Sequence, residues 1–264
     1  MPRKPAPKTT KKNPPEAPRR LAKAIADAGV CSRRKAEELI AQGHVELNGV
    51  LQTSPAVNVC KTDEVRVQGR PLNLAQKDLR VFAYHKPTGV ICAAHDPQDR
   101  TTVFDTLPKN TPRLVLVGRL DLNSEGLLLL TNNGDFAGKL MHPKNEFERI
   151  YKVRFRGTVS EKIRAEMANG PTIEGHTYRA VVVTPLNTQD APKDAQRANT
   201  WVEVKLMEGK NREIRKVFEH FGLQVNRLIR TSYGTTTLGD LPPKALRELT
   251  PEEIASLQKN IRPE

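Results

Sequence analysis

The pattern of apolar and polar positions changes twice within the first hundred residues. Residues 1–18 have no regularly spaced apolar positions and are rich in Pro, Lys and Thr, which predicts a disordered basic tail. From residue 19 apolar positions recur at helical spacing, and Asn48-Gly49 then gives a strong β-hairpin signal. Residues 19–70 therefore predict two short helices packed on a small sheet. The polar stretch 71–78 has no periodicity and indicates a linker.

The remainder of the chain, residues 79–255, predicts a second and larger domain. Short apolar runs predict strands at 81–84, 114–117, 127–131, 151–155, 180–184, 201–206 and from 225 onward. Helical spacing predicts helices at 103–107, 136–141, 160–169 and 212–221. Because the helices do not alternate with strands in βαβ order, the fold class is α+β with a mixed, largely antiparallel sheet. Residues 187–199 predict a surface loop, and 256–264 a C-terminal tail.

Charge and composition narrow the class of partner. The 264 residues carry a net charge of +13, and such an excess of cations favours nucleic acid, although plain solubility is the alternative. Three cysteines without a CxxC pair favour reduced thiols in a cytoplasmic protein. Six histidines without an HxxxH pair argue against a bound metal. No apolar run reaches the roughly 18 residues of a membrane span, so we expect no membrane association.

The second predicted helix carries three cations at its N-terminus. Ser32 suits the N-cap, and Arg33, Arg34 and Lys35 follow it, where positive charge opposes the helix dipole. Contact with phosphates and an ordinary solvated basic face both explain this placement. A similar spacing characterises the S4 domain, a small RNA-binding module; the matching residues are Arg20-Leu21, Gly29, Ser32-Arg33-Arg34, Ile40, Gly43-His44-Val45, Asn48-Gly49 and Val65. The resemblance implies that Arg33, Arg34 and Lys35 face RNA.

Candidate chemistry lies just beyond the strand predicted at 114–117, in Gly118-Arg119-Leu120-Asp121. In extended backbone the side chains of Arg119 and Asp121 point the same way, while Leu120 points into the core. A nearby guanidinium favours an ionised carboxylate, which could act as a nucleophile or a general base. On the tetrapeptide alone, a structural ion pair is the commoner explanation.

Further motifs follow the tetrapeptide in a fixed order. They are Ser124-Glu125-Gly126 through Asn132-Asn133-Gly134, Arg149-Ile150-Tyr151, Glu208-Gly209-Lys210-Asn211-Arg212-Glu213-Ile214-Arg215-Lys216, Leu228-Ile229-Arg230, Tyr233-Gly234 and Leu238-Gly239-Asp240-Leu241-Pro242-Pro243. Together with the S4-like segment, this order resembles the RsuA/RluB group of pseudouridine synthases. The resemblance covers nearly all of the chain except the N-terminal tail. It implies an isomerase that acts on ribosomal RNA.

The resemblance also implies a role for individual residues. Asp121 would be the essential carboxylate, and Arg119 would enter the space left by the flipped uridine or hold the backbone. Tyr151 would stack on the target base, and Ile214 would pack beneath the tyrosine. Arg215 would pair with Asp121 and keep it ionised. No cofactor is implied, because the isomerisation needs neither a redox change nor external energy.

One position departs from the family pattern, and the choice of ribosomal RNA is inferred from the similarity of two loops only. Glu213 stands where the family more often has Gln. The stretches 84–87 and 95–105 are most similar to the large-subunit members of the group. That similarity implies a 23S rRNA target near the peptidyl transferase centre, reached in rRNA or in ribosome assembly intermediates by a monomeric enzyme.

Two alternatives stay open from the sequence. The first is a 16S rRNA-directed synthase of the same group, which would share the catalytic motifs. The second is a non-catalytic S4-type ribosome assembly factor with a decayed synthase domain. The presence of Asp121, Tyr151 and Arg215 favours an enzyme over the assembly factor. A metal-dependent nuclease would need a cluster of carboxylates or histidines, which the sequence lacks.

Overall fold

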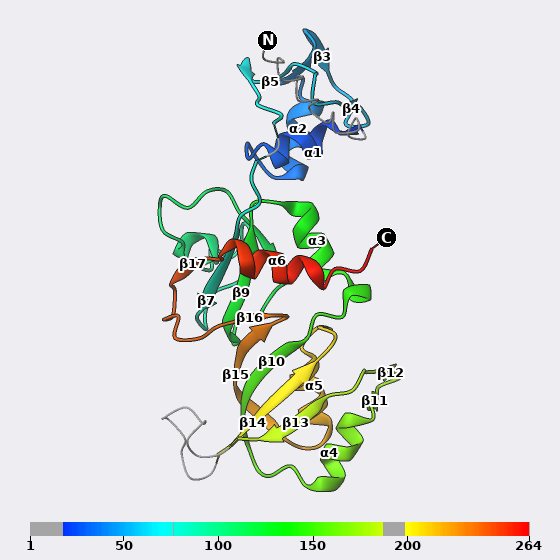
Figure 1. The fold of residues 1–264 in the computed structure, drawn as a ribbon, viewed down its shortest axis with the longest axis vertical. Helices are drawn as coiled ribbons and strands as arrows, with labels where there is room; N and C mark the ends of the chain where they lie inside the picture. Colours follow the sequence, from blue (N-terminus) through cyan, green and yellow to red (C-terminus); the bar gives the residue numbers. More distant parts are fainter. Residues whose placement is uncertain (1–17, 76, 187–198, 264) are drawn as a thin grey trace, which may run out of the picture. The chain divides into compact units, whose positions relative to one another are not determined.

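The chain forms two compact units, Met1–Asp78 and Leu79–Glu264 (Figure 1). The computed structural model describes residues 18–75, 77–186 and 199–263. The tail expected at 1–18 and the loop expected at 187–199 lie outside the described residues, apart from one residue of each.

The N-terminal unit contains two helices packed on a small antiparallel sheet, as the sequence predicts. Its elements are β1 (Arg19–Arg20), α1 (Leu21–Asp27), α2 (Arg33–Ala41), β2 (Val45–Leu47), β3 (Val50–Gln52), β4 (Asn58–Val59), β5 (Val65–Val67) and β6 (Arg70–Pro71). Strands β3, β2, β5 and β6 form one sheet in that order, and β1 pairs with β4. Apolar residues of both helices and of the sheet form one buried core, which includes Leu21, Ile25, Leu39, Ile40, Val45 and Val65.

Local signals set the boundaries inside this unit. The Ser32 hydroxyl accepts a hydrogen bond from the backbone N–H of Lys35 at 3.1 Å and so caps α2. Asn48 and Gly49 adopt φ of 51° and 78° in the turn between β2 and β3, as a tight hairpin requires. The expected linker is a partial exception. Leu74 is only 4% exposed and packs into the core of this unit, because an isolated leucine in a polar stretch still gains from burial.

The C-terminal unit is built on a nine-stranded sheet. Its strands are β7 (Val81–Lys86), β8 (Val115–Val117), β9 (Glu125–Thr131), β10 (Arg149–Arg156), β13 (Val182–Pro185), β14 (Asn199–Leu206), β15 (Gln224–Tyr233), β16 (Thr236–Thr237) and β17 (Leu246–Glu248). The main order is β13-β14-β10-β15-β9-β7-β17, with β16 on β15 and β8 on β9. Its pairs are antiparallel except for β15 with β9, so the predicted largely antiparallel sheet is confirmed.

Helices lie against both halves of this sheet. They are α3 (Gly134–Met141), α4 (Glu161–Ala168), α5 (Glu213–His220) and α6 (Pro251–Lys259), with short 3-10 turns at Phe104–Thr106 and Pro143–Asn145 and a small hairpin of β11 (Thr172–Ile173) and β12 (His176–Thr177). Figure 1 shows α3 and α6 near β7 and β9, and α4 and α5 near β10, β13 and β14. Strand β9 is buried on both faces: Leu127 and Leu129 join one core, and Leu128 and Leu130 join the other. This explains its unbroken apolar run.

Three segments differ from the sequence prediction. The helix expected at 103–107 is only the 3-10 turn Phe104–Thr106. Strand β17 and helix α6 were not predicted. The expected C-terminal tail begins inside α6, where Leu257 is fully buried, so the packed chain continues beyond residue 256. A signal for α6 was present: Thr250 and Glu253 form a capping box before its apolar positions.

Candidate active site

A pocket of about 800 Å³ opens in the C-terminal unit around the junction of β9 and β15. At this junction Ile229 pairs with Glu125, and Arg230 with Gly126, in parallel register. Residues of the β8–β9 loop, β10, β15 and the start of α5 line the pocket; among them are Arg119, Asp121, Tyr151, Arg212, Glu213, Ile214, Leu228 and Arg230. Four of the five positions inferred from the family resemblance therefore share one cavity, and Arg215 is not among its lining residues.

Asp121 lies on the loop between β8 and β9. Its neighbour Leu120 is 7% exposed and packs in the core, while Arg119 is exposed. The backbone N–H of Leu120 donates to the Cys92 sulfur at 3.4 Å, which holds the loop against the strand side of the pocket. The Asp121 side chain keeps 30% of its surface exposed. A carboxylate on an anchored loop that still faces the cavity is placed to meet a substrate.

Lys86, at the end of β7, holds the loop that carries Asp121 through hydrogen bonds to its backbone carbonyls. Its side chain is fully buried, and its ammonium donates to the carbonyl oxygens of Pro87 at 2.9 Å, Asp121 at 3.0 Å and Ser124 at 2.8 Å. Burial lowers the pKa of this ammonium, and nearby acidic groups, Asp121 among them, oppose the shift. Because carbonyls take its donors, Lys86 is a structural anchor of the Asp121 loop.

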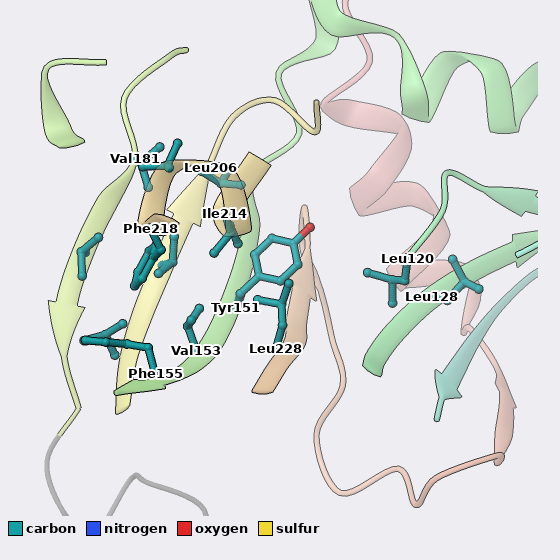
Figure 2. Close-up of a cluster of buried hydrophobic side chains, with 14 of the residues drawn as sticks. Leu120, Leu128, Tyr151, Val153, Phe155, Val181, Leu206, Ile214, Phe218 and Leu228 are labelled. Atoms are coloured by element: carbon teal, nitrogen blue, oxygen red, sulfur yellow. The ribbon is translucent and has the colours of Figure 1, made fainter. Parts of the chain in front are cut away.

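Tyr151 lies on β10, on the face of the sheet that bears the pocket. Its ring is 7% exposed and belongs to the same buried cluster as Ile214 and Leu228. Figure 2 shows Ile214 beside the ring and the hydroxyl directed toward the side where Leu120 lies. The structure thus brings Tyr151 and Ile214 together at the pocket wall.

The cation nearest to Asp121 differs from the expectation. Arg212 forms the ion pair, with Nη1 3.9 Å from Oδ2 of Asp121. Arg215 instead donates to the carbonyl oxygens of Val225 at 3.0 Å and Asn123 at 2.8 Å. Within the described residues Arg215 forms no ion pair with Asp121, because its guanidinium meets backbone one position past Ile214 on α5. Its charge still interacts with Asp121: burial lowers the pKa of Arg215, and the charge of Asp121 opposes that shift. Arg215 still contributes to the site, because it holds the carbonyl of Asn123 in the loop that carries Asp121.

Glu213 is the first residue of α5 and is buried beside Arg212. Its Oε2 accepts a hydrogen bond from the backbone N–H of Lys210 at 2.9 Å, which closes the turn that presents Arg212 in a left-handed conformation, with φ of 52°. Within the described residues its Oε1 has no hydrogen-bond partner. Burial raises the pKa of Glu213 from 4.5 to about 7, the hydrogen bond from Lys210 opposes the shift, and the charge of Glu208 adds to it.

Replacing Glu213 with glutamine should stabilise the protein at alkaline pH. In the folded chain Glu213 stays protonated up to about pH 7, whereas its ordinary pKa is 4.5, so stability is lost as pH rises from about 4.5 through 7. We expect Glu213→Gln to raise the thermal unfolding midpoint by roughly 5 °C at pH 8 and by almost nothing at pH 4. Unfolding curves over this range test it, with the exposed Glu219→Gln as control. A gain of equal size at every pH contradicts the assignment.

The three predicted cations of the N-terminal unit lie together on α2. Arg33, Arg34 and Lys35 are all exposed in its first turn, and Lys35 forms an ion pair with Glu38 at 2.8 Å. A basic helix end of this kind can contact phosphates.

Two kinds of feature are absent from the part of the chain that the structure describes. Over residues 18–75, 77–186 and 199–263, no group of three or more His, Cys, Asp or Glu side chains could hold a metal ion. None of the helices in these ranges is both long and apolar enough to cross a membrane.

The fold and the pocket define a class: an RNA-binding unit joined to a mixed-sheet unit whose pocket offers a carboxylate and an aromatic ring. Comparison with known families identifies both units. A family model for RNA pseudouridylate synthases matches residues 80–220, and one for S4 domains matches residues 19–65. The chain belongs to the RNA pseudouridylate synthase family and is an RNA pseudouridine synthase with an S4 domain.

Individual relatives agree with this family. An RNA pseudouridine synthase of Rickettsia bellii (strain RML369-C) is 47% identical over 88% of this chain and 96% of its own length. The ribosomal large subunit pseudouridine synthase B of Bacillus subtilis (strain 168) is 38% identical over 90% and 95%, respectively. A crystal structure of a pseudouridylate synthase is similar with a TM-score of 0.63 and 27% identity, over 90% of this chain and 99% of that one. These findings confirm the resemblance found in the sequence.

Proposed function

We propose that this enzyme converts one uridine of 23S rRNA, near the peptidyl transferase centre, into pseudouridine, with Asp121 as its catalytic carboxylate. The observation that carries the proposal is the single pocket that contains Asp121, Arg119 and Tyr151. The large-subunit target is supported by relatives named ribosomal large subunit pseudouridine synthase B. We further propose that the enzyme acts as a monomer in the cytoplasm, on rRNA or on assembly intermediates.

The pocket suits a base that has left its stack. The target uridine is rotated out of the RNA at a cost of a few kcal/mol. Stacking of a base on an aromatic ring returns ~1–3 kcal/mol, and Tyr151 provides that ring at the pocket wall, held by Ile214. The exposed Arg119 enters the gap left in the RNA. These contacts place the sugar beside Asp121.

The isomerisation then needs no external reagent. The N1–C1′ bond breaks with its electron pair left on the base, the base turns, and C5 bonds to C1′. The proton on C5 leaves and N1 takes one up, so the atoms of the nucleotide are conserved. Asp121 acts either as the nucleophile at C1′ or as the base that removes a sugar proton. The guanidinium of Arg212 lies 3.9 Å from the Asp121 carboxylate, and Lys86 and Arg215 fix its loop.

A mapping experiment tests the target. Pseudouridines are mapped at single-nucleotide resolution in rRNA from a strain that lacks the protein and from strains complemented with the native chain or with Asp121→Ala. We expect one 23S rRNA site to disappear and to return only with the native chain. A lost site in 16S rRNA would replace the proposed substrate, and an unchanged map would contradict it.

The S4 unit should supply much of the affinity for RNA. Replacing Arg33, Arg34 and Lys35 together with alanine should weaken RNA binding roughly 10- to 100-fold at about 0.1 M salt. The slope of log Kd against log salt should fall by about 2–3, because each lost phosphate contact removes ~0.7–0.9. Filter binding over a salt series measures both. Arg66→Ala is a matched control, since this exposed arginine belongs to the same unit but lies on β5 and not on α2. An unchanged salt slope would remove α2 from the RNA interface.

A further inference from the structure

A row of residues across the central sheet connects the two sides of the pocket. Tyr151 on β10 pairs with Arg230 on β15, Arg230 pairs with Gly126 on β9, and Gly126 pairs with Lys86 on β7. Arg230 therefore lies between the tyrosine proposed to stack on the base and the lysine that anchors the Asp121 loop. Gly126 makes this row possible: its φ is 105°, and a Cβ there would collide with the backbone of Arg230.

The guanidinium of Arg230 is buried with unused hydrogen-bonding capacity. The residue is 3% exposed and lines the pocket. Its Nε donates to the carbonyl oxygen of Leu127 at 2.7 Å, and its guanidinium carbon lies 5.3 Å from the centre of the Tyr233 ring. Within the described residues its Nη2 has no hydrogen-bond partner. A buried cationic donor left unsatisfied is costly, so a ligand that accepts this hydrogen bond gains more than one that meets a solvated arginine.

Arg149, another arginine that lines the pocket, has hydrogen-bond partners for both of its terminal nitrogens. Arg149 uses Nη1 on the carbonyl oxygen of Phe147 at 2.8 Å and Nη2 on the hydroxyl of Tyr233 at 3.2 Å. It also stacks over the Tyr233 ring at 4.9 Å. Arg149 is thus occupied in holding Tyr233, which Arg230 contacts from β15. The free Nη2 of Arg230 remains for the substrate.

We propose that Arg230 donates a hydrogen bond to a carbonyl oxygen of the flipped uracil and stabilises the negative charge that the base carries once the N1–C1′ bond has broken. The proposal rests on the proposed base-binding role of Tyr151. Bond cleavage leaves an electron pair on N1, which delocalises onto the ring carbonyls. A fixed guanidinium beside them lowers the barrier without reorganisation. The charge disappears when C5 bonds to C1′, after which C5 loses its proton and N1 takes one up.

Because Arg230 is buried, its ligand is the flipped base and not a backbone phosphate. Phosphates of bound RNA lie toward solvent, where the exposed Arg119 and Arg212 can reach them. Arg230 lies in the sheet itself, next to Tyr151. An uncharged uracil that becomes anionic during the reaction is a ligand that a buried cation stabilises more in the transition state than in the ground state.

The first test measures single-turnover isomerisation at saturating RNA. Arg230→Met should lower the rate constant roughly 100-fold, the usual loss when one donor to a developing anion is removed, with RNA affinity within about threefold. Arg227→Met is the matched control: this arginine lies on the same strand, on the opposite face, paired with Glu125 at 2.5 Å. Weaker RNA binding with an unchanged saturating rate would instead make Arg230 a phosphate anchor and overturn the proposal.

The second test separates charge stabilisation from a structural role. RNA with 5-fluorouridine at the target position carries a base whose anion is intrinsically more stable, and consumption of that nucleoside is followed by mass spectrometry. We expect Arg230→Met to lose no more than about 10-fold on this RNA, because the base itself now stabilises the charge. Equal losses on both RNAs would overturn the proposal.

Two further variants test whether Arg230→Met simply misfolds and whether the proposed base pocket is correct. Arg230→Lys keeps a cation in the sheet and should show a smaller loss with the same dependence on fluorine. If this variant folds but loses the same factor on both RNAs, the proposal fails. Tyr151→Leu checks the base pocket independently. A normal rate for this variant would overturn the proposed site, whereas a slow rate supports the site, and the Arg230 variants then decide the role of the guanidinium.

Discussion

Replacing Asp121 with asparagine should abolish pseudouridine formation, with a fall of roughly 10⁴-fold or more in the single-turnover rate constant. The amide has the shape of the carboxylate but can neither attack C1′ nor accept a proton at neutral pH. The fold should persist, because within the described residues the one ion pair of the Asp121 side chain is that with Arg212 at 3.9 Å, and the side chain is 30% exposed. An exposed ion pair of this length contributes less than about 1 kcal/mol.

The measurement uses saturating RNA, so that binding and chemistry are separated. RNA affinity should change less than about threefold, since a single surface charge near phosphates is a small part of the total. Asp240→Asn, at an exposed turn outside the pocket lining, serves as control and should keep the native rate. Substantial activity in the Asp121 variant would remove this residue from the chemistry and leave the family assignment intact.

Replacing Lys86 with methionine should have the largest effect on stability. The change removes the ammonium donor from three carbonyl oxygens, those of Pro87, Asp121 and Ser124, although the carbonyl of Asp121 keeps its hydrogen bond from the backbone N–H of Ser124 at 3.1 Å. We expect a loss of about 3 kcal/mol, or roughly 6–12 °C in the unfolding midpoint of a unit of this size. The same change releases the loop, and a displacement of about 1 Å at Asp121 costs roughly 100-fold in rate.

Two measurements distinguish anchoring from general destabilisation. Rates are taken at a temperature where thermal unfolding shows the variant to be folded. Lys139→Met, at an exposed position of α3, is the matched control and should affect neither quantity. A variant that is destabilised yet retains the native rate at saturating RNA would show that Lys86 supports the fold without positioning Asp121.

Much of the fold was predictable because its signals are local. Strand β9 could be recognised from its apolar run, and α2 from Ser32 followed by spaced apolar positions. Helix α6 was missed although its capping box is a local signal, whereas the other missed features depend on tertiary contacts. Strand β17 is three residues long and exists because it pairs with β7, and Leu74 is buried only because the N-terminal core is adjacent. No periodicity within either segment could reveal those neighbours.

The candidate site was likewise predictable only in part. Sequence resemblance indicated Asp121, Tyr151 and Ile214, and the structure places them around one pocket. It did not indicate that Arg212 rather than Arg215 forms the ion pair, because the left-handed backbone of Arg212, with φ of 52° just before α5, is not visible in the sequence pattern. Arg230 was part of a recognised motif without a role; its antiparallel register with β10 places it beside Tyr151, and its parallel register with β9 places it beside Gly126.

The parallel pairing of β15 with β9 also has a consequence for the order in which the enzyme acquires activity during synthesis. The loop with Asp121 leaves the ribosome early, but Arg212, Arg230 and strand β17 come from the last third of the chain. Contacts so distant in sequence form late and slowly. A nascent chain can therefore fold its S4 unit and bind RNA before it has an active pocket, so RNA binding should precede catalytic competence in the life of each molecule.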